Sequence, residues 1–407
     1  MFIQPTRRAA ACAALCLVSF TAFGLAQRAA AVSFIDLAVY RAAGSTVRAG
    51  QDLYAMRVTG LDLPMTYPPF AGLLFTPLTL LSMPVARLAT TVANLLLVIV
   101  FVHLSLRLVD RPDRPPRTAV TLFVAAFAVW CEPVWSTVGN GQINLLLAVA
   151  VLGDLTLCAG RRWAGVGTGL AAGVKLTPLL FVLFLTAAGV LDRRRRGAPE
   201  ERRAPDPWLR SAAGATAAFV ATVALPGLLM PRDSLRFWTT TVFQPSRPGD
   251  AAHDANQSVR GLVARLLGTT DPGLPWLATA LVLALLGLGT AALLATGRRD
   301  RPDLAWPLLC CATTTLLVSP VSWSHHWVWC VPLTLLVAAE ARRLGSWPWW
   351  CAAAAMWLTF SSFAVWWAPG LTVLPAAVTS GLYTAAALAF LAACVARCLA
   401  DRRAAER

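Results

Sequence analysis

The sequence predicts an all-α, polytopic integral membrane protein with about twelve transmembrane helices. Hydrophobic residues make up 57% of the 407 residues, and apolar runs long enough to cross a bilayer recur along the whole chain. Segments of about ten residues with alternating polarity, which a transmembrane β-barrel requires, are not found in the sequence. We therefore expect one helical domain over residues 1–407, rather than a soluble domain with a membrane anchor.

Basic residues mark the ends of the apolar runs. The formal net charge is +15, and Lys175 is the only lysine, so almost all of the positive charge belongs to arginine. In a soluble protein this balance would indicate a nucleic acid partner. Arginines beside apolar runs instead indicate the positive-inside rule, and we expect no nucleic acid. The clusters lie at residues 7–8, 107–117, 161–162, 193–210, 298–301, 342–343 and 397–407.

Placing these clusters in the cytoplasm determines the predicted spans and puts both termini inside. The segment 163–191 is too short for two full crossings, and a single crossing would put residues 193–196 outside. We expect two short or re-entrant helices that meet at Lys175–Pro178, followed by an arginine-rich cytoplasmic loop at 193–210. The predicted spans are 9–26, 85–109, 118–134, 141–158, 163–175, 176–191, 211–230, 275–297, 304–320, 326–341, 347–366 and 372–397.

The first of these segments has an alternative interpretation. Two arginines followed by an apolar run and small residues also resemble a secretory signal peptide. The ten cysteines lie mostly within predicted spans and form no pattern of paired CxxC motifs. We interpret them as small apolar residues and expect neither a disulfide framework nor a metal site.

Asp36 is the most informative residue of the first outer segment, 27–84. A carboxylate at the mouth of a multi-span protein is costly to desolvate, so it usually serves chemistry or transport. The same segment carries Tyr40 and, in a Tyr-Pro-Pro sequence, Tyr67. We expect one or two interfacial helices here, because prolines end one helix and direct the next. A rigid corner with an interfacial tyrosine is the alternative for Tyr67.

Two further outer motifs carry amides and an ammonium group. Gln142 and Asn144 follow Asn140 into the next predicted helix, where their amides offer paired donors and acceptors. A helix cap would explain Asn140, but it would not explain the other two. Lys175 is a lone ammonium among apolar residues and therefore requires an anion or a snorkelling path to water. An anionic ligand and snorkelling both remain open.

The last two outer motifs are rich in polar and aromatic side chains. Asn256 and Arg260 are candidates to contact a sugar or a phosphate, and an exposed surface charge is the alternative for Arg260. His325 and His326 stand at a predicted helix start among tryptophans. Adjacent helical positions point about 100° apart, so the two rings can hardly bind one metal ion. A phosphate contact and an interfacial aromatic belt are both compatible with the pair.

All of these motifs fall on the extracytoplasmic side of the predicted topology, which indicates one outward-facing cavity. A carboxylate that takes the proton of an attacking hydroxyl contributes about 10²–10⁴-fold to a rate. Cationic and histidine side chains stabilise the charge on a leaving phosphate. No glycine-rich phosphate loop is present in the sequence, which disfavours an ATP-driven pump. The combination favours a membrane glycosyltransferase that uses a polyprenyl-phosphate sugar.

Seven short segments, weak singly, form an ordered set that resembles a known family. The segments are Asp36–Tyr40, Asp52–Tyr54, Thr66–Phe70, Gly141–Asn144, Gly173–Pro178, Asn256–Gly261 and Ser319–His326. With them the chain resembles the polyprenol-phosphate-mannose-dependent alpha-1,2-mannosyltransferases of actinobacteria, glycosyltransferase family 87, within the GT-C class. The resemblance implies an inverting enzyme of the plasma membrane with an extracytoplasmic site, a polyprenyl-phosphate sugar donor and a glycolipid or polysaccharide acceptor. It implies no cofactor.

The resemblance also implies roles for single residues. Asp36 is the expected general base, and either His325 or His326 is expected near the donor phosphate. Lys175 and Arg260 are our own candidates for phosphate contact. No acidic residue neighbours Asp36 in the sequence, and we expect no catalytic metal. The candidates for substrate or donor binding are Tyr40, Tyr67, Gln142, Asn144, Lys175, Asn256, Arg260, His325 and His326.

Three alternatives remain at the level of function. The family resemblance also admits transfer of arabinofuranose from decaprenyl phosphate arabinose. A lipid-linked sugar transporter or flippase would require polar residues through the membrane and on both faces. The cytoplasmic segments predicted here are plain arginine clusters, which disfavours a transporter. A non-catalytic scaffold for envelope assembly is the third alternative.

Overall fold

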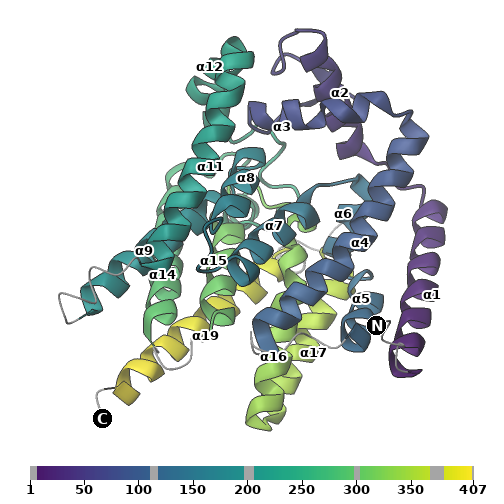
Figure 1. Ribbon diagram of the computed structural model, residues 1–407. Helices are drawn as coiled ribbons and strands as arrows, with labels where there is room; N and C mark the ends of the chain where they lie inside the picture. The colour runs from purple at the N-terminus through teal and green to yellow at the C-terminus, as the bar shows by residue number, and fades with distance from the viewer. Residues whose placement is uncertain (1–6, 111–117, 197–205, 298–302, 367–379, 406–407) are drawn as a thin grey trace. The chain divides into compact units, whose positions relative to one another are not determined.

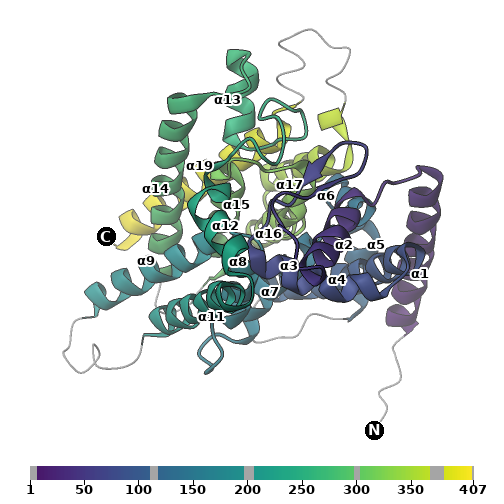
Figure 2. The ribbon, with the colours of Figure 1, turned by 90° about the horizontal axis from the view of Figure 1, so that it is seen from above.

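The computed structural model describes residues 7–110, 118–196, 206–297, 303–366 and 380–405. Most of these residues are helical (Figure 1, Figure 2). They belong to two compact units. The first unit comprises residues 1–38, 81–152 and 325–363, and the second comprises 39–80, 153–324 and 364–407. Helices satisfy their own backbone hydrogen bonds, which is why an apolar chain folds in this way in lipid.

The first unit is built around a long helix, α4. Helices α5, α6 and α16 pack on α4, while α1 packs on α5 and α17 packs on α16. Helices α2 and α7 begin in this unit and continue into the second. The elements are α1 (Arg7–Ala29), α2 (Ile35–Arg48), α4 (Met83–Asp110), α5 (Thr118–Ala128), α6 (Glu132–Asn140), α7 (Asn144–Leu157), η3 (Ser324–Trp329), α16 (Cys330–Leu344) and α17 (Trp347–Ser361).

The second unit has two packed groups of helices. Helix α11 packs on α8, α9 and α3, and α14 packs on α9, α15 and α19. Its elements are β1 (Arg57–Val58), β2 (Leu63–Pro64), α3 (Pro69–Phe75), η1 (Thr76–Leu80), α8 (Val166–Val174), α9 (Leu179–Arg195), α11 (Pro207–Leu229), α12 (Pro231–Thr239), η2 (Thr241–Phe243), α13 (Val259–Leu267), α14 (Gly273–Gly297), α15 (Ala305–Val318), η4 (Ala364–Trp366) and α19 (Leu382–Ala405).

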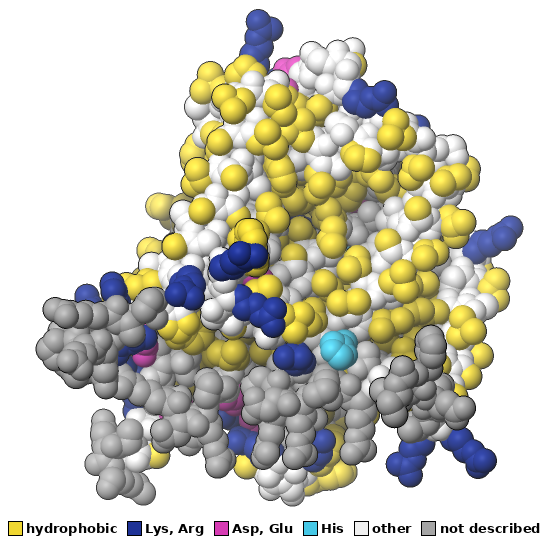
Figure 3. Space-filling model, in the orientation of Figure 1, with side chains coloured by type: hydrophobic (Ala, Val, Ile, Leu, Met, Phe, Trp, Pro, Cys, Tyr) yellow, Lys and Arg dark blue, Asp and Glu magenta, His cyan; other side chains and the backbone are white. Residues whose placement is uncertain are grey.

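Within the described residues, five helices are long and apolar enough to cross a bilayer: α1, α4, α11, α14 and α19. The pair α5 and α6, bent by 77°, makes a sixth if it acts as one span. Hydrophobic side chains cover much of the face seen in Figure 3. The prediction of an all-α, multi-pass membrane protein is therefore confirmed. Every predicted span overlaps a helix, but several of these helices are shorter than a full crossing, and residues 372–379 of the last span lie outside the described residues.

A glycine-rich face of α8 lies against small residues of α11. Gly165, Gly169 and Gly173 recur every fourth residue of α8 and its N-cap, so they share one face. A Cβ atom added at Gly169 would lie 2.2 Å from the Ala215 carbonyl oxygen, and one at Gly173 would lie 2.1 Å from Thr222 Oγ1. Small residues at such spacing let helix backbones approach closely in a membrane. The contact fixes α8, and with it Lys175 at its C-terminal end.

The buried carboxylate of Asp154 holds the start of α8. Its two oxygens accept hydrogen bonds from the Gly165 N–H at 2.8 Å and from the Thr168 N–H at 3.0 Å. The Thr168 hydroxyl donates a third bond at 2.7 Å. These bonds satisfy donors that the first turn of a helix leaves unpaired, which is why an acidic residue is tolerated at this depth.

The predicted break at Lys175–Pro178 is confirmed, because α8 ends at Val174 and α9 begins at Leu179. The predicted loop at 193–210 is shorter than expected. Helix α9 continues to Arg195 and α11 already begins at Pro207, while residues 197–205 lie outside the described residues.

The two ends of this connection are tied together. Arg196 contacts Asp192 at 2.8 Å and Asp206 at 3.1 Å, and Asp206 also caps α11. Burial raises the pKa of Asp206, and the neighbouring Asp192 adds to the effect.

The first outer segment contains two helices, α2 and α3, as expected, and Pro69 opens the second of them. It also contains a short antiparallel hairpin that the pattern did not predict, in which Arg57 pairs with Pro64 and Val58 pairs with Leu63. Strands of two residues carry no detectable alternation of polarity, so no sequence pattern indicates them.

Candidate functional site

Asp36 lies in the first turn of α2, in the part that belongs to the first unit. The preceding Phe34 has a left-handed φ of 51°, and its N–H donates to the Gly139 carbonyl at 3.0 Å. Gly141 ends α6 with φ of 68°, and a Cβ there would lie 2.7 Å from Leu37 Cβ. Glycine is therefore required at 141 by both the backbone angle and the close approach of α2. Asp36 is held beside the turn between α6 and α7.

The same turn holds the backbone of His325. The His325 carbonyl accepts hydrogen bonds from Thr137 Oγ1 at 2.8 Å and from Asn144 Nδ2 at 2.9 Å. The Asn140 amide lies 3.4 Å from His325 Nδ1. The rings of His325 and His326 meet edge to face, with centroids 4.7 Å apart. The first unit thus brings the predicted residues Asn144, His325 and His326 together at the start of α16.

Gln142 belongs to the same region through its backbone. Its carbonyl accepts a hydrogen bond from Asn94 Nδ2 of α4 at 3.4 Å. The side chains of Gln142 and Asn144 are buried, with 3% and 6% of each residue exposed. The Asn144 amide therefore supports the His325 segment from inside the protein. Direct contact of these two amides with a donor stays a prediction.

In the second unit, Tyr40, Tyr67 and Lys175 form one cluster. The Tyr40 and Tyr67 hydroxyls are 3.0 Å apart, and the Tyr40 ring stacks on Phe75 at 4.2 Å. The Lys175 Nζ atom lies 5.6 Å from the centre of the Tyr67 ring. An aromatic face attracts an ammonium group at this distance. The cluster therefore presents a cation held on an aromatic surface, which can pair with an anionic group of a ligand.

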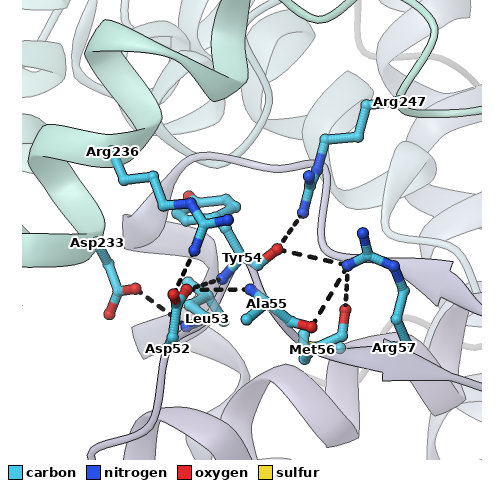
Figure 4. A network of polar contacts seen from close by, with 9 residues as sticks. All are labelled: Asp52, Leu53, Tyr54, Ala55, Met56, Arg57, Asp233, Arg236 and Arg247. Atoms are coloured by element: carbon cyan, nitrogen blue, oxygen red, sulfur yellow. Dashed lines mark hydrogen bonds and ion pairs between the residues drawn. The ribbon is translucent and has the colours of Figure 1, made fainter.

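A network of polar contacts around Tyr54 supports this cluster (Figure 4). The Tyr54 hydroxyl donates to the Tyr67 carbonyl at 2.9 Å. Its own carbonyl accepts from Arg247 Nη2 at 2.6 Å and from Arg57 Nη1 at 3.4 Å. Asp52 accepts the Tyr54 N–H at 2.9 Å and forms an ion pair with Arg236. The first outer segment is thus tied to α12 and to the residues that follow it.

Burial shifts the acid–base equilibria in this network. It raises the pKa of Tyr54, and the nearby Asp233 carboxylate adds to the effect, so the phenol stays protonated and remains a donor to Tyr67. Burial also raises the pKa of Asp233. It lowers the pKa of Arg247, with smaller contributions in the same direction from the cations Arg57 and Arg236.

Asn256 is the centre of a separate, buried cluster in the second unit. Its Nδ2 donates to the Ala251 carbonyl at 3.0 Å. Its Oδ1 accepts from the Ser322 N–H at 3.0 Å and from the Ser258 hydroxyl at 2.9 Å. Asn256 is fully buried, and both ends of its amide are used inside the protein. Its contact with a donor stays a prediction.

Arg260 is buried, with 1% of the residue exposed, which excludes the alternative of an exposed surface charge. Its Nη1 donates to the Pro245 carbonyl at 2.8 Å, and the guanidinium lies 5.2 Å from the centre of the Trp276 ring. Burial lowers its pKa, and Asp271 and Asp250 oppose that shift. Arg260 forms no salt bridge within the part of the chain that the structure describes, and its phosphate contact stays a prediction.

Charged groups of the second unit lie at opposite ends of α9. Lys175 precedes its first residue, Leu179, and three arginines occupy its last turn. Seventeen residues of helix correspond to about 25 Å. Arg196 ties this second end to the start of α11. The Lys175 cluster is therefore well separated from the arginine-rich connection at 193–210.

Several residues of these networks are absent from the predicted set. Tyr54 falls in a matching motif without an assigned role, and Asp233, Arg236 and Arg247 are in none of the motifs. The sequence signal that could have pointed to Asp233 and Arg236 is the presence of three charged residues within the short helix α12. Among the described residues, no three His, Cys, Asp or Glu side chains gather closely enough to hold a metal ion.

Comparison with known proteins places this architecture in a family. The model of "Glycosyltransferase family 87" matches residues 65–320. A solved structure of ArnT from Cupriavidus metallidurans bound to undecaprenyl phosphate aligns with 92% of this chain and 76% of that chain, at 16% identity and a TM-score of 0.36. That alignment is too weak to support an inference.

Two curated relatives are much more similar in sequence. One is a polyprenol-phosphate-mannose-dependent alpha-(1-2)-phosphatidylinositol mannoside mannosyltransferase from Mycolicibacterium smegmatis, 37% identical over 84% of this chain and 76% of its own length. A Mycobacterium tuberculosis protein with the same name is 35% identical over 76% of this chain and 71% of its own length. With these similarities on top of the matched residues 65–320, the chain belongs to glycosyltransferase family 87.

Proposed function

We propose that this protein transfers mannose from polyprenyl phosphate mannose to a hydroxyl group of a phosphatidylinositol mannoside or a related envelope glycolipid. The observation that carries the proposal is the 37% identity, over 84% of the chain, to a relative named for that donor and that acceptor. The relatives' names favour mannose over arabinose and a glycolipid over a polysaccharide. Membership of an enzyme family disfavours the transporter and the scaffold.

Asp36 acts as the general base of the reaction. The acceptor oxygen attacks the anomeric carbon of mannose, and its proton passes to the Asp36 carboxylate. The bond between the anomeric carbon and the phosphate oxygen breaks, and polyprenyl phosphate leaves with the electron pair. Attack from the face opposite the leaving group inverts a β-linked donor to an α-linked product. The position of Asp36 at the start of α2, beside the glycine turn that also supports His325, suits a fixed base.

Lys175 and one of the two histidines stabilise the departing phosphate. The ammonium on the Tyr67 ring supplies positive charge in a region of low dielectric constant, where it is more effective than in water. His325 has its backbone held by Thr137 and Asn144, so its imidazole is presented from a fixed main chain. The histidine that contacts the phosphate is His325 or His326.

The site faces the extracytoplasmic side of the plasma membrane. Support comes from the second unit, where Lys175 and the arginines at 193–196 lie at opposite ends of α9. The positive-inside rule puts the arginines, and the connection at 193–210, in the cytoplasm. Reporter fusions test this orientation. A reporter inserted between residues 197 and 205 is expected to give a cytoplasmic signal. An extracytoplasmic signal from that position would overturn the proposed orientation.

The test of the activity is an assay of the purified full chain with polyprenyl phosphate mannose, polyprenyl phosphate arabinose and a phosphatidylinositol mannoside acceptor. We expect transfer of mannose and no transfer of arabinose. Asp36→Asn is expected to lower kcat by about 10²–10⁴-fold while the variant still binds the donor. Asp62→Asn is the matched control, because Asp62 is exposed in the same outer segment and has a φ of 55° that asparagine tolerates. Full activity of Asp36→Asn would remove the general-base role.

A further inference from the structure

We propose that Tyr54 is a positioning residue that sets the place of the Lys175 ammonium group by holding Tyr67. The proposal rests on the proposed function, in which Lys175 contacts the donor phosphate. No motif or comparison assigns Tyr54 a role. The inference comes from the contacts that surround it in the second unit (Figure 4).

Tyr54 is fixed at its backbone, its ring and its hydroxyl. It is fully buried, and its ring stacks on Phe237 of α12 with centroids 5.5 Å apart. Its N–H donates to Asp52, and its carbonyl accepts from Arg247. A tyrosine held at so many points has one low-energy position, so its hydroxyl reaches Tyr67 from a fixed direction.

The support for Tyr54 comes from distant parts of the sequence. Arg247 donates from Nη2 to the Tyr54 carbonyl and from Nε to the Met65 carbonyl at 3.0 Å, so one guanidinium joins the two sides of the hairpin β1–β2. Asp233 of α12 accepts the Leu53 N–H at 3.0 Å. The planar, multi-donor guanidinium suits such a bridge, which an ammonium group would not reproduce.

Tyr67 connects Tyr54 to Lys175. The Tyr67 carbonyl is bonded to Tyr54, its hydroxyl lies next to that of Tyr40, and its ring lies under the Lys175 ammonium group. A lysine side chain has four rotatable bonds, and the aromatic face of Tyr67 is one contact that restricts where the charge lies. Loss of the Tyr54 hydroxyl should therefore move the Tyr67 ring and the ammonium without unfolding the protein.

The first test observes Lys175 directly and requires no enzymatic activity. Because Lys175 is the only lysine, reductive methylation with ¹³C-formaldehyde labels one side chain besides the N-terminal amine, and the two signals differ in chemical shift. In the full chain in nanodiscs, ring currents from Tyr67 should displace the Lys175 methyl signal. We expect Tyr54→Phe to move that signal and Tyr383→Phe to leave it unchanged, since Tyr383 is a buried tyrosine of α19. An unchanged signal in Tyr54→Phe would overturn the proposal.

The second test asks whether Tyr54 acts through Lys175 during turnover. Tyr54→Phe is expected to raise the KM for polyprenyl phosphate mannose by about 3- to 10-fold, the effect of one neutral hydrogen bond, with kcat changed by less than about twofold. In a Lys175→Met background the same substitution should change KM by less than about twofold. Equal effects in both backgrounds would indicate a general structural role and would contradict the proposal. If the wild-type protein transfers no mannose, the proposed function fails, while the methyl signal still decides the role of Tyr54.

Discussion

Asn256 and Lys175 were both predicted to contact the donor, yet the structure uses them differently. Both lie in predicted outer segments, and both belong to the second unit. Asn256 is fully buried, and its amide joins three parts of the protein. Lys175 is partly exposed and rests on a tyrosine ring. We therefore expect Asn256 to serve folding and Lys175 to serve ligand binding, because one is fully buried and the other is partly exposed.

The largest expected effect is on the Asn256 cluster. Asn256→Ala would leave the Ser322 N–H and the Ser258 hydroxyl without their acceptor in a buried place. We expect the free energy of unfolding to fall by about 3 kcal/mol or more, since each unsatisfied buried group costs about 1–3 kcal/mol. Thermal unfolding in nanodiscs measures the loss. If Asn256→Ala kept normal stability but no longer bound the donor, Asn256 would be a ligand-binding residue, and this interpretation would be wrong.

The next effect is on donor binding rather than folding. Lys175→Met keeps an unbranched, slightly shorter side chain and removes its charge. We expect the KM for polyprenyl phosphate mannose to rise by about 10- to 100-fold, because a hydrogen bond to a charged group contributes about 1.5–3 kcal/mol. The unfolding midpoint should stay the same. Lys175→Arg should recover part of the affinity. A lowered midpoint in Lys175→Met would instead support the snorkelling interpretation, in which the lysine serves the fold.

The contact of α8 with α11 should affect both the stability of the protein and its binding of the donor. Gly169→Ala would place a methyl group against the Ala215 carbonyl oxygen, which must move. We expect a loss of about 1–3 kcal/mol in the free energy of unfolding, together with a higher donor KM because α8 carries Lys175. Gly227→Ala in α11 is the matched control, since nothing lies within 4 Å of its added Cβ. Equal stability of the two variants would mean that the glycine face does not position α8.

The smallest expected difference is between Arg236, which pairs with Asp52, and Arg247, which donates to the Tyr54 carbonyl. Arg236 and Asp52 form an exposed pair, with 43% and 47% of their side chains accessible, so Arg236→Met should reduce stability by less than about 1 kcal/mol, and less still at high salt. Arg247 is only partly exposed and donates to two carbonyls. Arg247→Met should therefore cost more, about 2 kcal/mol. Chemical denaturation at two salt concentrations measures both, and a larger loss in Arg236→Met would contradict this order.

The sequence was sufficient where a pattern is local. Lone charges, prolines and arginine clusters predicted the break between α8 and α9, the two helices of the first outer segment and the multi-pass class. It was insufficient where contacts join distant residues. Arg247 and Tyr54 are 193 positions apart, and the periodicity of a helix or strand carries no information at that range.

The candidate site shows the same limit. The motifs identified Asn144 and His325 as candidates. They did not predict that the Asn144 amide donates a hydrogen bond to the His325 carbonyl. They also identified Asn256 but did not predict that it is buried, because its burial depends on the tertiary packing of residues 251, 258 and 322. The arginine-rich segment was drawn too long because Arg193–Arg195 extend α9, where cations at a helix C-terminus are favourable.

The meeting point of α8 and α11 has a consequence for how a ligand can reach Lys175. Gly173 touches Thr222, and about two further turns of α11 extend beyond that point to Leu229. Lys175, just past Gly173, is therefore recessed below the end of α11. Any anion that pairs with this lysine would have to pass those last two turns of α11 to reach it.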